Sequence, residues 1–238
     1  MKKLVVKTFI SIMILCFSNK ASAQYYFYND GYYENPVMFE MGLSVGAMNS
    51  LTDLGGKQGI GAKFIKDLNI GNTEFTGGLY FSGMYKYAFG VRIELNYSKV
   101  SAYDSILAGV TGIAQARYNR NLSFKSNITE IAIVAEFHPL FTFIDWRAKD
   151  RDPPRFSPYL LLGVGFFSFN PQANLNNKWV YLQPLSTEGQ GFAEYPDRKP
   201  YKLNAISVPI GAGVKYELSS LVNLRFEFDY RATNTDYI

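Results

Sequence analysis

The sequence has few of the residues on which catalytic and metal sites are most often built. Its 238 residues include one cysteine, Cys16, and one histidine, His138. A single thiol excludes a disulfide framework within the chain. A single histidine excludes a multi-histidine metal site. Charged residues are also sparse, at 18% against the roughly 25% of soluble domains.

The small basic excess is confined to the start of the chain. The formal net charge is +4, and the first 23 residues contain four lysines and no acidic residue. The remainder therefore holds 20 basic and 20 acidic residues. A neutral chain of this kind argues against a nucleic-acid binder that works by neutralising phosphates.

Residues 1–23 are predicted to be a secretory signal peptide. Lys2 and Lys3 form the positive start, residues 9–17 form a short apolar run, and Ala21-Ser22-Ala23 provides small residues for cleavage. The apolar run is far shorter than the ~20 residues that span a bilayer as a helix. We expect cleavage after Ala23, which also removes Cys16.

Seven later segments alternate apolar and polar residues with period two, the pattern of strands with one apolar face. The clearest places Val91, Ile93 and Leu95 against Arg92 and Glu94. The seven predicted strands lie near 37–47, 79–87, 91–98, 130–137, 159–167, 206–216 and 224–231.

These strands predict an antiparallel up-and-down transmembrane β-barrel over residues 37–238. Each approaches the ~9–11 residues of a tilted membrane-spanning strand. A soluble antiparallel sandwich also alternates, but its wet face would rarely carry glycine at period two. Here the polar face holds the pairs Gly42/Gly46, Gly163/Gly165 and Gly211/Gly213, as a crowded lumen favours.

Bacterial single-chain barrels have even strand numbers. Seven strands therefore indicate the small eight-strand type, with the last strand missing from this chain.

The lengths of the connections predict the orientation of the barrel. Long connections at 49–75, 101–122 and 170–201 should be extracellular, because such barrels have short periplasmic turns. The tyrosine-rich segment 24–36 is then periplasmic. The connection 138–157 is the exception, a long segment on the periplasmic side.

The polar face carries charges of both signs, which we interpret as a salt-bridged plug. An eight-strand interior is only wide enough for its own side chains, so no pore is expected. His138 is interpreted as a residue at the membrane interface, without a serine and carboxylate around it. The predicted lumen charges are Arg92, Glu94, Glu130, Glu136, Lys215, Arg225, Glu227, Asp229 and Arg231.

Several passages resemble the PorG family of Bacteroidetes type IX secretion outer-membrane proteins. They are 48–56 (Met-Asn-Ser-Leu-Thr-Asp-Leu-Gly-Gly), 120–127 (Arg-Asn-Leu-Ser-Phe-Lys-Ser-Asn), 157–171, 179–191 (Trp-Val-Tyr-Leu-Gln-Pro-Leu-Ser-Thr-Glu-Gly-Gln-Gly) and 235–237 (Thr-Asp-Tyr). The most specific passage supplies the family-signature residues Trp179, Leu182, Gln183, Pro184, Thr187, Glu188, Gly189, Gln190 and Gly191.

The resemblance implies a non-enzymatic barrel in the outer membrane that contacts periplasmic ring proteins of the secretion machine. It implies no catalytic residue, cofactor or small-molecule substrate. The connection 138–157 is the predicted partner contact, because it is long, charged and carries a tryptophan. The candidate contact residues are Asp145, Trp146, Arg147, Lys149, Arg151 and Arg155.

Two other classes of protein remain open. A structural or adhesive barrel that binds through its extracellular loops would have the same strands. A barrel enzyme acting on lipids would need a nucleophile and a base, and the sequence does not place either beside its one histidine.

Overall fold

The computed structural model describes residues 35–52, 54–56, 68–109, 112–143, 154–187, 189–219, 221–235 and 237. The predicted signal peptide and most of the tyrosine-rich segment lie outside these residues. Within them, no helix is both long and apolar enough to cross a membrane.

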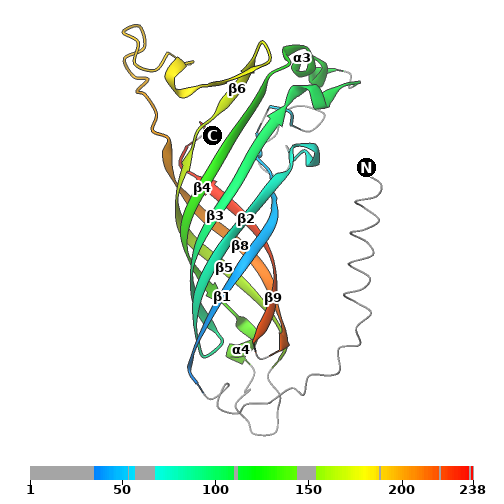
Figure 1. Ribbon diagram of the computed structural model, residues 1–238, viewed down its shortest axis with the longest axis vertical. Helices are drawn as coiled ribbons and strands as arrows, with labels where there is room; N and C mark the ends of the chain where they lie inside the picture. Colours follow the sequence, from blue (N-terminus) through cyan, green and yellow to red (C-terminus); the bar gives the residue numbers. More distant parts are fainter. Residues whose placement is uncertain are drawn as a thin grey trace.

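The described chain forms one antiparallel sheet that curls into a half-barrel (Figure 1). Seven strands follow one another in the order β1-β2-β3-β4-β5-β8-β9, and each pairs with its neighbour in sequence along this path. Two short strands, β6 and β7, form a hairpin attached to β4. The strands are β1 (Val37–Met48), β2 (Glu74–Tyr85), β3 (Phe89–Tyr103), β4 (Ser123–Phe137), β5 (Phe156–Phe169), β6 (Gln172–Leu175), β7 (Lys178–Tyr181), β8 (Asn204–Ser219) and β9 (Val222–Thr233).

The two ends of the half-barrel differ in their connections. One end, the turn end, carries the β2–β3 and β8–β9 turns and the short helix α4 (Pro139–Phe143). The other, the loop end, carries the longer connections and the β6–β7 hairpin (Figure 1). Its helical elements are α3 (Ile113–Arg120), η2 (Ile70–Asn72), η3 (Asp104–Leu107) and η4 (Gln183–Leu185).

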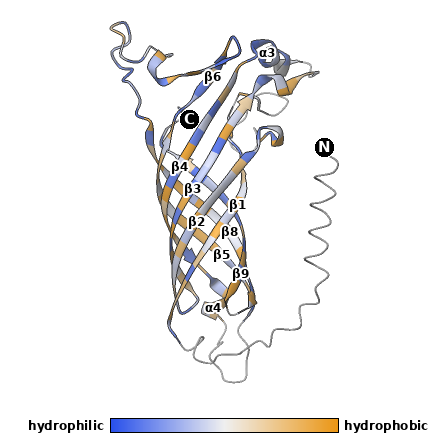
Figure 2. Ribbon diagram, viewed as in Figure 1, coloured by the Kyte–Doolittle hydropathy of each residue, from blue (hydrophilic) through white to orange (hydrophobic). Residues whose placement is uncertain are grey.

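The period-two pattern separates an apolar outer face from a polar inner face. On β3, Val91 and Leu95 are 57% and 49% exposed, whereas Arg92 between them is 3% exposed. Figure 2 shows hydrophobic residues distributed along the strands and a mostly hydrophilic α3. The exposed side chains on the outer face are therefore mainly apolar, the reverse of a water-facing surface.

Some strands are longer than the sequence predicted. In these strands the backbone pairing continues beyond the last residues that alternate between apolar and polar. The ladder between β3 and β4 continues to the pair Tyr103 and Ser123, beyond the predicted ends at 98 and 130. Its outer face there carries Lys99 and Lys125 instead of apolar residues, so alternation gave no signal. Tyr87, predicted in a strand, is buried in the β2–β3 turn with φ 57°.

The β6–β7 hairpin was also missed. Its strands are four residues each, and they join at Asn176-Asn177, where both residues have positive φ. This is the backbone of a two-residue hairpin turn, for which asparagine is well suited.

Candidate functional site

The inner face near the turn end holds a network of ion pairs centred on Arg92 and Arg225. Arg92 on β3 pairs with Glu94, with Glu136 on β4 at 3.0 Å, and with Glu227 on β9 at 2.8 Å. Arg225 on β9 pairs with the same Glu136 oxygen at 2.7 Å. Glu136 is completely buried, so these arginines supply the positive charge that a buried carboxylate requires.

Glu40 joins this network from the first strand and was not among the predicted lumen charges. One of its carboxylate oxygens accepts from Lys215 Nζ at 2.7 Å and from Asn223 at 3.2 Å. The other accepts from Arg225. The inner faces of β1, β8 and β9 are therefore connected by side chains. The alternation of the first strand placed Glu40 on the polar face and could have identified it.

A second ionic cluster lies around Arg231 on β9. Its guanidinium pairs with Glu130 at 2.8 Å, with Asp229 at 3.3 Å and with Glu94 at 3.7 Å. The Ser207 hydroxyl donates to the other Glu130 oxygen. With these contacts, each of the nine predicted lumen charges lies on the inner face and has a partner of opposite charge there.

Glycines on the inner face allow the wall and the interior to pack closely. A Cβ on Gly163 would lie 2.5 Å from the Ile133 carbonyl oxygen, and one on Gly211 would lie 2.4 Å from the Phe228 carbonyl oxygen. These are backbone atoms of neighbouring strands, so they move only if the sheet moves. Towards the interior, a Cβ on Gly42 would lie 2.5 Å from Tyr80 Oη and one on Gly213 would lie 2.5 Å from Tyr159 Cζ, so these glycines leave room for inward aromatic side chains.

Towards the loop end, the inner face changes from charged to apolar. Its core cluster comprises Val100, Ala102, Phe124, Ile128, Phe167, Phe169 and Ala205, with Met48, Leu54, Tyr201 and Tyr237 packed against it. Phe167 and Phe169 are each 2% exposed. The interior is thus filled by ion pairs near the turn end and by hydrocarbon near the loop end.

The interpretation of His138 as an isolated interface residue is wrong. His138 is completely buried, its Nδ1 lies 2.8 Å from Ser157 Oγ, and its Nε2 lies 3.4 Å from Glu136 Oε2. Its ring stacks on Tyr159 at 4.8 Å. Sequence reasoning missed this because Ser157 reaches His138 only when β5 returns beside β4, 19 residues later.

This serine, histidine and carboxylate have the order of a catalytic triad, but their surroundings suit a structural role. Ser157 is 2% exposed, and Glu136 is already paired with two arginines. Burial lowers the pKa of His138, and the positive charges of Lys215 and Arg225 lower it further, against the opposing effect of Glu136. A neutral histidine can then accept one hydrogen bond and donate another, which connects β4 to β5.

The family-signature residues lie at the loop end. The Trp179 ring packs edge-on against Tyr103 at 6.5 Å and lies under Lys125, whose Nζ is 4.2 Å from the ring centroid. Leu182, Gln183, Pro184 and Thr187 lie in and around η4. Gln190 is buried, between Gly189 and Gly191, which have φ of 78° and 80°. Glu188 lies outside the described residues. The described part of the passage runs from β7 through η4 into the loop that follows.

The predicted partner contact lies mainly outside the described residues. Of its candidates, Asp145, Trp146, Arg147, Lys149 and Arg151 fall there. Arg155 is described, is exposed, and its carbonyl accepts from the Glu217 amide at 2.8 Å. The connection that carries these residues joins α4 to β5.

No protein-family model, curated protein or solved structure matches the chain. The fold and the inner face define its class as an all-β antiparallel half-barrel with an apolar outer face and a filled interior. The resemblance to the PorG family stays a prediction.

Proposed function

We propose that this protein is an outer-membrane β-barrel that acts as a structural component of a secretion machine, not as a pore. One observation carries the proposal. The outer face is apolar and exposed, while the inner face is filled with ion pairs and aromatic side chains. A wall with this polarity is suited to lipid outside and to a closed, side-chain-filled interior.

In this proposal one further strand completes the wall between β1 and β9. Within the described residues, β1 pairs only with β2 and β9 only with β8. Unpaired backbone is costly in hydrocarbon. Both edge strands run from the turn end to the loop end, so a single strand running the opposite way would be antiparallel to both. The even strand number of bacterial barrels supports the same conclusion.

The assignment to type IX secretion rests on the family resemblance of the loop passages. It makes the turn end the periplasmic face and gives the connection after α4 the role of contacting the ring proteins. The filled interior supports a role in which the barrel anchors other proteins, because the ion pairs leave little room for transported polypeptide.

Deletion of the gene is the experiment that tests this function. The expected result is loss of bulk protein secretion, with outer-membrane lipid and porin content unchanged. Restoration by the intact gene is the control. If secretion continues at the normal level in the deletion strain, the secretion assignment fails.

An adhesive barrel is the second candidate, and one observation favours it. The long connection between β5 and β8 exposes large apolar side chains at the loop end, namely Leu175, Tyr181, Leu185, Phe192 and Tyr195. Exposed apolar patches often mark binding sites. In this case the deletion strain would lose surface attachment and keep its secretion.

A further inference from the structure

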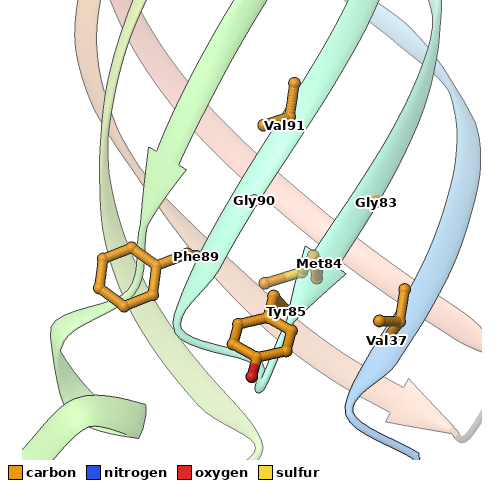
Figure 3. Close-up of a pocket in the computed structure, with 7 residues that line it drawn as sticks. All are labelled: Val37, Gly83, Met84, Tyr85, Phe89, Gly90 and Val91. Carbon is orange, nitrogen blue, oxygen red and sulfur yellow. The ribbon is translucent and has the colours of Figure 1, made fainter.

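The outer wall carries an apolar groove at the turn end, lined by residues of β1, β2 and β3 (Figure 3). Gly83 is the outward residue of β2, and it pairs with Phe39 of β1 on one side and Val91 of β3 on the other. The Phe39 ring lies against Gly83, since a Cβ there would be 3.3 Å from Phe39 Cε1, and the groove is lined by Gly83 and the neighbouring residues of β1, β2 and β3. The groove has a volume of about 280 Å³.

The walls of the groove are apolar and belong to three adjacent strands. Val37 lies on one side, and Phe89 and Val91 lie on the other, with Tyr85 at the end nearest the turn (Figure 3). Each of these four side chains is between 39% and 57% exposed. The apolar lining of the groove suits a hydrocarbon guest.

A positive charge lies at the turn end of this groove. Lys86 follows Tyr85 directly, and its ammonium lies 5.1 Å from the centroid of the Tyr85 ring. Its backbone N–H donates to the Pro36 carbonyl at 2.7 Å, which ties the turn to the start of β1. Lys86 and Tyr87 both have positive φ, at 51° and 57°, as the tightest hairpin turns require. The cation is thus held beside the opening of the groove.

We infer that the groove binds one acyl chain of an anionic phospholipid whose phosphate contacts Lys86. This inference rests on the proposed position in a membrane, with the turn end at the level of the headgroups. An aromatic residue and a lysine at that level match the usual composition of a membrane interface. The adjacent ammonium group of Lys86 favours a negative headgroup, while the apolar lining of the groove suits a chain of methylenes.

The test measures lipid retention by the full-length protein, extracted in mild detergent and equilibrated with palmitoyl-oleoyl phosphatidylglycerol or phosphatidylcholine. Native mass spectrometry counts the lipids that stay bound. The unaltered protein should retain one phosphatidylglycerol with about fivefold preference over phosphatidylcholine, the size of one lysine–headgroup interaction.

Two substitutions distinguish the contribution of the acyl-chain contact to lipid retention from that of the headgroup contact. Gly83→Leu fills the groove with hydrocarbon and should abolish retention of either lipid. Lys86→Gln leaves the groove open and should reduce the preference to near unity while one lipid is still retained. The matched controls are Ala212→Leu, at an exposed small residue on the outer face, and Lys178→Gln at the loop end. Both controls should behave as the unaltered protein does.

The outcomes distinguish this inference from the proposed function. If the unaltered protein inserts into vesicles but Gly83→Leu retains lipid equally well, the groove is not the lipid site. If Lys86→Gln keeps the full preference, the headgroup contact is wrong. Co-purification of a polypeptide that only Gly83→Leu releases, without any lipid preference, would replace the lipid by a protein partner. If the unaltered protein does not enter vesicles at all, the membrane assignment itself fails.

Discussion

At the scale of single residues, Asp104 shows how one buried carboxylate can organise a long connection. It accepts from Arg120 Nε at 2.8 Å and from the backbone N–H groups of Gly55 and Leu122 at 3.0 and 3.1 Å. Three segments of the loop end thus meet at one side chain. Burial raises the pKa of Asp104, but the hydrogen bonds from Arg120, Gly55 and Leu122 outweigh it and the pKa is lowered.

The lowered pKa of Asp104 predicts a loop end that loosens in acid. Its contribution to stability is complete above the unfolded value of about 3.9 and is lost as the pH falls through the lower folded value. At neutral pH, Asp104→Asn should destabilise the loop end by about 1–3 kcal/mol. Limited proteolysis of the 104–122 segment from pH 7 to pH 3 measures this.

The protease resistance of wild type and Asp104→Asn should converge as the pH falls below about 4. The exposed Asp197→Asn is the control and should match the wild type throughout. If the difference in protease resistance between wild type and Asp104→Asn stays constant down to the lowest pH, the ionised Asp104 carboxylate does not stabilise the loop end.

Neighbouring residues on β3 provide a direct test of which face meets lipid. Leu95→Arg would place a charge on the outer face and should cost about 2–4 kcal/mol in a membrane. Asn96 points inwards, where its amide donates to Glu94 at 3.0 Å, so an arginine there finds an acidic partner. Urea unfolding of both variants in vesicles, followed by the electrophoretic mobility of the folded protein, compares their free energies of unfolding. An equal loss for both substitutions, or a loss only for Asn96→Arg, would invert the assignment of faces.

At the scale of elements, the sequence predicted the presence of the seven sheet strands better than the residues at which they end. The seven strands of the sheet path were all found, because one exposed apolar face gives a strong alternation signal. That signal ends where Lys99 and Lys125 replace the apolar residues, although the pairing continues. The inner charges could be found in the same way. Their partners could not, because Glu40 and Arg225 meet only through the curvature of the whole sheet.

The connection between α4 and β5 is the element we expect to contact a periplasmic partner. Replacing residues 144–155 by a short Gly/Asn turn should leave the strands intact, because the segment ends before β5 begins at Phe156. Co-purification with ring proteins and secretion should both fall, since charged loops with aromatic anchors are typical interaction sites.

A replacement within the loop of the other end supplies the control for that experiment. Residues 192–199 precede β8 at the loop end. Replacing them by a Gly/Asn segment should leave co-purification with the ring proteins unchanged. If the shortened 144–155 variant folds and secretes normally, the external loops become the better place to look for a partner.

At the scale of the whole molecule, the filled interior predicts a barrel that does not conduct ions. Arg92, Glu136 and Arg225 are each nearly buried and paired, and Phe167 and Phe169 occupy the other end. Full-length protein in planar bilayers should therefore give no conductance steps, because the interior of so small a barrel is occupied by side chains. A porin reconstituted in parallel serves as the positive control. Reproducible conductance steps from the unaltered protein would contradict the conclusion that side chains fill the interior.

The contact of Glu40 with the last two strands also has a consequence for how the chain folds. Lys215 and Arg225 follow Glu40 by 175 and 185 residues, so this contact has nearly the longest sequence separation the described chain allows. Contacts between such distant residues form late and slowly, because closing a long loop costs entropy before any interaction is gained. Until then the apolar outer strands and their edges are exposed, which favours aggregation. If the protein is exported to the outer membrane as proposed, we therefore expect the unfolded chain to need a periplasmic chaperone until Lys215 and Arg225 reach Glu40.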